Sequence, residues 1–319
     1  MRRVVTVAVL TASLGLATVA NAAWPERPVT VIVPFAAGGI ADVIARLTAE
    51  QLQAAFKQAF LVENQSGGAG IIAADRVAKA RPDGYTLLST PIFQITMAPF
   101  THTVTFDPVK DFKPIAAIAG SPFVITVGGS FPAKTLADFI AYVKANPGQL
   151  TFGSAGTGSL THVSSAVFLK SAGLDMVHVP YRGVAPAFTD LLAGHIAMLS
   201  ASPVELKPYL ESGKVKPLAV TSAARSRQLS NVPTIAETLK SPPVVTYNGL
   251  LGPARTPDDI VAAILRELNA PDKSAAFQER LAKVGAEPIL STPEEFARII
   301  AADTDQWRDI VRDLNLRIQ

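Results

Sequence analysis

Two loops rich in small residues are the parts of this sequence best suited to bind an anion. Loop 1, Pro34–Asp42, follows an apolar β-branched run, and loop 2, Gly153–His162, follows a short strand-like run. Each leads into a helical pattern, so free backbone N–H groups and the positive end of a helix could hold a carboxylate or phosphate without arginine. Glycine is also found in ordinary strand–helix turns because it allows their backbone geometry. Loop 1 by itself is therefore consistent with either an anion site or an ordinary turn.

Loop 2 adds the hydroxyl groups of Ser154, Thr157 and Ser159 to its backbone donors. Ligands of open α/β sheets bind beyond the carboxyl ends of strands, so two such loops on opposing lobes would line one cleft. A carboxylate suits this cleft because it only accepts hydrogen bonds and gains charge-assisted ones. We expect Asp42 to cap its helix or brace loop 1 rather than to contact the anion directly.

Two other segments carry weaker signals. Arg182 follows a predicted strand and could face the cleft, although arginine in a surface turn is the commoner finding. The turn Ser66–Gly70 resembles the two loops in composition, and we interpret it as structural.

The sequence contains no motif of a hydrolase nucleophile, a zinc protease or a phosphate-binding P-loop. Four histidines, at 102, 162, 178 and 195, lack metal-ligand spacing, and there is no cysteine. We therefore expect no enzymatic activity, no cofactor and no metal. A secreted hydrolase assembled from distant residues such as Ser159 and His162 stays an alternative. Nucleic-acid binding is not expected, because neither a basic stripe nor interleaved aromatics occur.

The first 22 residues have the layout of a secretory signal peptide. Arg2 and Arg3 precede an apolar run to Ala20, and Ala20-Asn21-Ala22 has the small-x-small form of a cleavage site. Cleavage would remove two positive charges and lower the formal net charge from +3 to +1. We expect a periplasmic, soluble protein without a lipid anchor, because the cut offers no cysteine.

The elements that must position both loops alternate between strands and helices. Apolar runs at 28–34, 60–63 and 85–89 predict strands, and the spacing at 41–60 and 70–80 predicts helices. The pattern repeats after Pro122, with strands at 123–127, 150–152, 176–179, 196–200 and 218–221 and helices at 134–146, 160–171 and 185–193. This order predicts two α/β units, each a mainly parallel sheet flanked by helices.

The C-terminal third is predicted to be mostly helical. Thr256 and Thr292 each precede Pro and two acids, which predicts N-caps at both threonines. The last helix has one apolar face, including Phe296, Ile300 and Trp307, that should pack on the first lobe. We predict that 23–122 and 250–319 form lobe 1 and 123–249 form lobe 2, with crossing strands near 123–127 and 244–251.

The sequence resembles the Bug family, the TctC-like receptors of tripartite tricarboxylate transporters. The resemblance rests on ordered segments spread over almost the whole chain after residue 22. They are Trp24–Thr30, loop 1, Arg81–Leu88, Pro132–Thr135, loop 2, His178–Gly183, Leu218–Thr221 and Val232–Thr234.

The resemblance implies a type II-like periplasmic binding protein whose two lobes close on a small carboxylate, with membrane permease subunits as partners. It assigns one set of carboxylate contacts to Phe35, Ala36, Ala37, Gly38, Gly39, Ala41 and Asp42. It assigns the other set to Ser154, Ala155, Gly156, Thr157, Gly158 and Ser159, to which we add His162. The far end of the ligand would then be read by Thr90, Ile92, Phe93, Arg182, Gly183, Ser200, Ala201 and Ser202.

Several positions depart from the family pattern. Family members often carry proline where Ala37 stands, a hydroxyl residue at Ala41, and tryptophan at Tyr247. Ile92 and Phe93 predict an apolar far wall, which favours an aromatic or aliphatic carboxylate over citrate. We expect a monomer that serves uptake. The alternative is a receptor that signals through a sensor kinase, which the sequence does not separate from transport.

Overall fold

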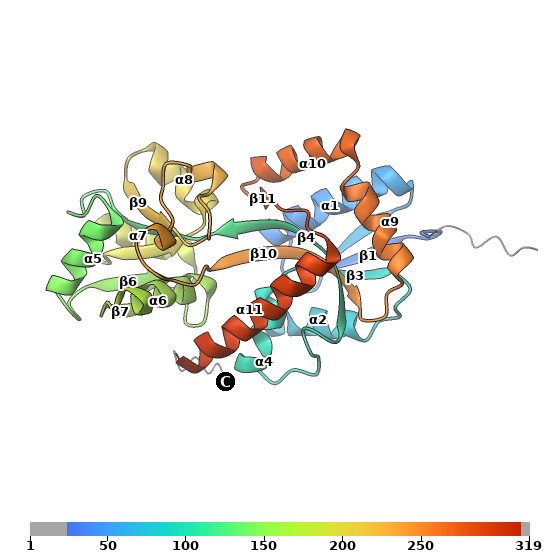
Figure 1. The fold of residues 1–319 in the computed structure, drawn as a ribbon, viewed down its shortest axis with the longest axis horizontal. Coiled ribbons are helices and arrows are strands. Elements are labelled where there is room, and N and C mark those ends of the chain that lie inside the picture. Colours follow the sequence, from blue (N-terminus) through green and yellow to red (C-terminus); the bar gives the residue numbers. More distant parts are fainter. Residues whose placement is uncertain (1–23, 314–319) are drawn as a thin grey trace, which may run out of the picture.

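The computed structural model describes residues 24–313, which form two lobes, each built on one β-sheet (Figure 1). The sheet of lobe 1 has the strand order β11 (Glu287–Pro288), β4 (Phe112–Pro122), β10 (Val245–Pro253), β3 (Thr86–Pro91), β1 (Val29–Val33), β2 (Phe60–Asn64). The sheet of lobe 2 has the order β7 (Val177–Pro180), β6 (Thr151–Ser154), β8 (Met198–Ala201), β5 (Val124–Gly128), β9 (Val215–Val220). The predicted two-lobed α/β class is confirmed.

Both sheets are mixed rather than mainly parallel, because each combines two parallel strand pairs with antiparallel ones. In lobe 1, β10 is antiparallel to both β3 and β4, whereas β1 is parallel to β2 and β3. In lobe 2, β5 is antiparallel to β8 and β9, whereas β6 is parallel to β7 and β8. The ends of the parallel strands carry loops 1 and 2, as expected of βα units.

Helices cover both faces of each sheet. Lobe 1 carries α1 (Ile40–Phe56), α2 (Ile71–Ala78), α3 (Phe93–Thr96), α4 (Ala98–Thr101), α9 (Asp258–Leu268), α10 (Pro271–Lys283) and α11 (Pro293–Asp313). Lobe 2 carries α5 (Leu136–Ala145), α6 (Leu160–Ala172), α7 (Val184–Ala193) and α8 (Pro203–Glu211). Short 3₁₀ turns lie at η1 (Gly68–Gly70), η2 (Arg227–Leu229) and η3 (Ile235–Glu237). Helix α1 ends at Phe56, before the predicted end at Phe60, because Lys57 adopts a left-handed conformation and Phe60 begins β2.

The chain passes between the two sheets at Phe123, which separates β4 from β5, and near Val244, which precedes β10. Thr221 ties these passages together. Its backbone N–H donates to Phe123 O (2.9 Å), and its carbonyl accepts from Val244 N–H (3.0 Å). Figure 1 shows β4 and β10 side by side where they reach toward lobe 2.

Helix α11 packs on both lobes. Phe296 and Ile300 lie in the core of lobe 1, as predicted. Trp307 and Ile310 belong to a separate buried cluster with Val163 of α6, so the second half of the helix also contacts lobe 2. Within residues 24–313, no helix combines the length and apolar character needed to cross a bilayer. The predicted signal peptide lies outside the described residues.

The two predicted threonine caps have different outcomes. Thr292 accepts from Glu295 N–H (3.1 Å) and Glu295 accepts from Thr292 N–H (2.9 Å), so this capping box is confirmed. The cap predicted at Thr256 is wrong. Its hydroxyl donates to Pro253 O (2.8 Å) and helix α9 begins at Asp258 without a side-chain cap.

Candidate functional site

A cavity of about 470 Å³ lies between the two lobes. Its floor is formed by the ends of β3, β4 and β10, and its walls by the N-termini of α1, α6 and α8. The lining residues are Phe35, Gly39, Ile40, Ala41, Ile44, Pro91, Phe93, Gly120, Ser121, Phe123, Leu160, Ser202, Val204, Glu205, Thr246, Asn248, Gly285 and Ala286. Among them Glu205 is the one side chain with a formal charge, and no described lining residue is basic.

The N-terminus of α1 opens into this cavity without a side-chain cap. Gly39 holds the N-cap position in an extended conformation, and Ile40 and Ala41 are the first helical residues. The first N–H groups of a helix have no partner within it, and they carry the positive end of the helix dipole. These amides are therefore available to an anion in the cavity.

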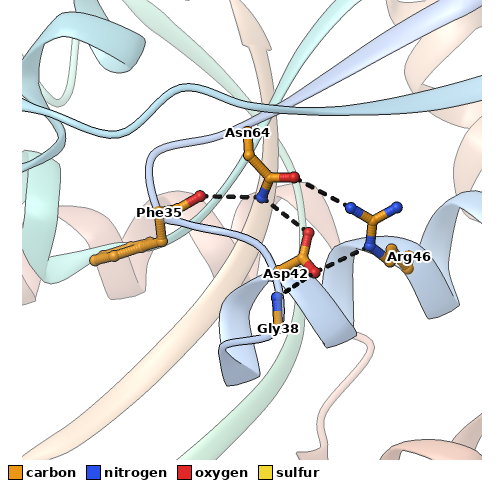
Figure 2. A network of polar contacts seen from close by, with 5 residues as sticks. All are labelled: Phe35, Gly38, Asp42, Arg46 and Asn64. Atoms are coloured by element: carbon orange, nitrogen blue, oxygen red, sulfur yellow. Dashed lines mark hydrogen bonds and ion pairs between the residues drawn. The ribbon is translucent and has the colours of Figure 1, made fainter.

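Asp42 braces loop 1 instead of facing the cavity, as the sequence led us to expect (Figure 2). Its carboxylate accepts from Gly38 N–H (2.9 Å), Arg46 Nε (2.9 Å) and Asn64 Nδ2 (2.8 Å). Asn64 also donates to Phe35 O (3.0 Å), so the same network fixes the start of the loop. Gly38 N–H is thereby occupied within the protein.

The environment of Asp42 favours its charged form. Burial alone would raise the pKa of this carboxyl group, but the hydrogen bonds from Arg46, Gly38 and Asn64 together lower it below its usual value. The side chain is 3% exposed, whereas that of Arg46 is 47% exposed. Loop 1 thus rests on a buried carboxylate that stays ionised at neutral pH.

Loop 2 uses most of its own donors internally. Ala155 N–H donates to Thr161 Oγ1 (2.8 Å), Gly156 N–H to Ser154 Oγ (3.1 Å) and Ser159 N–H to Gly156 O (3.1 Å). Ser159 caps α6 by accepting from the His162 N–H (3.2 Å). Leu160, the first residue of α6, is the part of this loop that lines the cavity.

His162, which we predicted to contact the ligand, instead meets His178 beneath loop 2. The rings of His162 and His178 stack with centroids 3.9 Å apart. His162 Nδ1 accepts from Gly158 N–H (3.2 Å), and His178 Nε2 lies 2.7 Å from Ser154 Oγ. Burial and the neighbouring His178 lower the pKa of His162 to about 4, so the ring is neutral at pH 7. The pair supports loop 2 from below.

Two buried polar atoms on β10 have no hydrogen-bond partner within residues 24–313. Thr246 Oγ1 and Asn248 Oδ1 are buried and unpaired, and both residues line the cavity floor. Being two positions apart, they share one face of the strand. Sequence reasoning missed both, although the alternation of polar Thr246 and Asn248 in an apolar strand was a signal.

The remaining predicted site residues fall into two groups. Phe35, Gly39, Ala41, Phe93 and Ser202 line the cavity. The residues that do not line it are Ala36, Ala37, Gly38, Asp42, Thr90, Ile92, Ser154, Ala155, Gly156, Thr157, Gly158, Ser159, His162, Arg182, Gly183, Ser200 and Ala201.

Burial explains part of this division. Thr90 and Ile92 are each 1% exposed, and Ile92 packs in the core of lobe 1. Pro91, the last residue of β3, and Phe93, the first residue of α3, line the cavity instead. The apolar wall predicted from Ile92 is therefore formed without it. Ser200 is buried, and its Oγ forms a hydrogen bond of 2.5 Å with Ser164 Oγ. Arg182 is exposed. No group of three or more His, Asp or Glu residues within 24–313 is placed to hold a metal ion.

The family model described as "Tripartite tricarboxylate transporter family receptor" matches residues 44–316. Protein BugT of Bordetella pertussis is 31% identical over 326 residues, covering 100% of this chain and 99% of BugT. Among solved structures, Rpa4515 of R. palustris with adipate is 34% identical with a TM-score of 0.76, covering 93% of this chain and 100% of that one. MatC from Rhodopseudomonas palustris with bound malate is 31% identical with a TM-score of 0.71, covering 90% and 100%.

Proposed function

The chain belongs to the family of tripartite tricarboxylate transporter receptors, and on this premise we propose that it captures a small organic carboxylate between its lobes. It then delivers the ligand to the membrane permease subunits of such a transporter. The observation that carries the proposal is the cavity between the lobes, which is bordered by the uncapped amides of α1 and has no basic side chain among its described lining residues.

In the proposed complex the carboxylate lies between the N-termini of α1 and α6. Gly39, Ile40 and Ala41 supply backbone N–H groups from lobe 1, and Leu160 supplies one from lobe 2. Thr157, which is exposed at the tip of loop 2, adds its hydroxyl when the lobes close. Amides at helix N-termini bind anions through hydrogen bonds and the helix dipole, so no arginine is needed.

The solved relatives support this ligand class. Rpa4515 was solved with adipate and MatC with malate, and both are small carboxylates. The cavity walls of the present chain include Phe35, Phe93 and Phe123, which favours a ligand with an apolar body. Binding would shift the population toward a closed state, because the ligand contacts both lobes at once.

The proposal includes a periplasmic location, reached by cleavage of the signal peptide at 1–22, and a monomeric receptor. Titration calorimetry of the protein beginning at Ala23, with adipate, malate, citrate, hexanoate and benzoate, tests the binding step. We expect at least one of these ligands to bind, and binding of none of them would refute the proposal.

Uptake separates transport from signalling. A strain lacking the gene should lose uptake of the ligand that binds in vitro, and regain it with the wild-type gene. Normal uptake together with lost induction of ligand-responsive genes would instead assign the receptor to signalling with a sensor kinase.

A further inference from the structure

The unpaired polar atoms of β10 mark the cavity floor as a second recognition point. Asn248 is 5% exposed, yet its Oδ1 has no hydrogen-bond partner in the described part of the chain, and neither has Thr246 Oγ1. Nearly all buried polar groups in proteins are paired, because an unpaired one loses its hydration without compensation. Both residues line the space between the lobes, although the two atoms themselves are buried, so a molecule bound against this floor could pair them once the side chains turn toward it.

This floor lies at a distance from the amides that are proposed to hold the carboxylate. Strand β10 is separated from β1, which leads into loop 1, by the single strand β3. Neighbouring strands are about 4.8 Å apart, so β10 and the strand that leads into loop 1 are roughly 10 Å apart across the sheet. A carboxylate with a body of about six carbons or one aromatic ring spans most of that gap.

The charge of the cavity determines what the far end of the ligand can be. A second carboxylate at Thr246 and Asn248 would find no basic side chain among the described lining residues, and it would share the cavity with Glu205. Glu205 is engaged as a helix cap, accepting from Ser202 N–H (2.9 Å). An uncharged hydroxyl or amide, by contrast, can both donate to and accept from Asn and Thr side chains.

We propose that Asn248 and Thr246 select carboxylates whose far end carries an uncharged hydrogen-bonding group, in preference to dicarboxylates. This inference rests on the proposed function, since it assumes that the other end of the ligand is a carboxylate bound by α1 and α6. It departs from the dicarboxylates seen in the two solved relatives.

Calorimetry with three matched ligands tests the inference. Hexanoate, 6-hydroxyhexanoate and adipate share a six-carbon chain and differ at the far end in having a methyl, a hydroxyl or a carboxylate. Benzoate, 4-hydroxybenzoate and benzene-1,4-dicarboxylate repeat the comparison on an aromatic ring. We expect one of the two series to fit the cavity. Within that series, the hydroxyl compound should bind about tenfold more tightly than the methyl or hydrogen compound and the dicarboxylate.

Three variants locate the effect. Asn248→Leu keeps the size of the side chain and should weaken binding of the hydroxyl ligand about tenfold while changing that of hexanoate or benzoate little. Thr246→Val should act in the same direction, which covers the event that the first variant fails to fold. Tyr247→Phe is the control, because Tyr247 lies on the same strand but does not line this cavity.

The outcomes are distinguishable. Tightest binding by a dicarboxylate would overturn the inference and leave the proposed function standing. An equal loss for all ligands in Asn248→Leu would mean that Asn248 serves lobe closure, which also overturns it. Binding of no carboxylate would overturn the proposed function and this inference together.

Discussion

Replacing Asp42 by asparagine tests whether loop 1 depends on a buried charge. The carboxylate accepts three hydrogen bonds, of 2.8 to 2.9 Å, from Gly38, Arg46 and Asn64. Asparagine keeps one acceptor oxygen and turns the other into a donor, so one of the three bonds becomes a clash between donors. The two that remain lose the assistance of the negative charge.

The expected magnitude follows from these bonds. A neutral hydrogen bond contributes about 1 kcal/mol to stability and one to a charged group about 2 kcal/mol. Losing one bond and weakening two should lower the free energy of unfolding by about 2–3 kcal/mol, because Arg46 is half exposed and partly screened. Ligand affinity should fall as well, since loop 1 then no longer holds the α1 amides in place.

The assay is urea unfolding followed by tryptophan fluorescence, with Arg46→Gln as the matched control that removes only the half-exposed cation. The control should cost less than about 1 kcal/mol. The pKa of Asp42 is lowered in the folded state, so its stabilisation is complete above the ordinary value of 3.8 and is lost as pH falls through the lower folded value. The difference between wild type and Asp42→Asn should therefore shrink as the pH falls below 3.8. Equal stability at pH 7, or a difference that is the same at all pH values, would refute the reasoning.

Three more predictions follow from the same geometry. Gly38→Pro should weaken ligand binding more than tenfold in calorimetry, because proline removes the N–H that is bound to Asp42 and does not fit a residue whose φ is +90°. Arg182→Ala should change the affinity less than twofold, and the reverse order would make Arg182 the anion partner. Gly285→Ala should lower the affinity for the ligand at least tenfold, because the added methyl group would meet Val204 Cγ2 at 1.8 Å and push α8 from the cleft. Unchanged affinity would show that α8 can move at this point without affecting the site. Burial lowers the pKa of His162 from 6.5 to about 4, so the free energy of unfolding should fall as the pH drops from 6.5 to 4. His162→Asn should flatten that decline in urea unfolding. An unchanged slope would mean that His162 is not buried as a neutral ring.

The alternation of apolar runs and helical spacing was enough to predict the two-lobed α/β class, and β1, α1 and loop 1 follow the predicted pattern. Strand β4 was missed because Phe112–Pro122 is rich in alanine and contains two prolines, which hide its strand character. Helix α8 was missed for a similar reason, since Pro203 and Pro208 interrupt its pattern. Local propensity is a weak guide where tertiary pairing decides the structure.

The candidate site was predictable in its chemistry more than in its residues. The role of Asp42 as a brace followed from its place at the start of a helix. The stacking of His162 on His178 did not, because it depends on the pairing of β6 with β7, which brings distant segments together. The choice of Pro91 over Thr90 depends on the register of β3 against β10, because a shift by one residue reverses which side chains of a strand face the cleft. The choice of Phe93 over Ile92 depends on where α3 begins, which the sequence did not indicate.

The most direct test of the account is an amide NMR titration of ¹⁵N-labelled protein with 6-hydroxyhexanoate and adipate. If backbone amides hold the carboxylate, the signals of Gly39, Ile40, Ala41 and Leu160 should shift strongly downfield as the ligand saturates the site. The signal of Gly38, whose N–H is bound to Asp42, should move much less. Saturable binding that leaves the amides of α1 and α6 unshifted would mean that these amides do not hold the carboxylate.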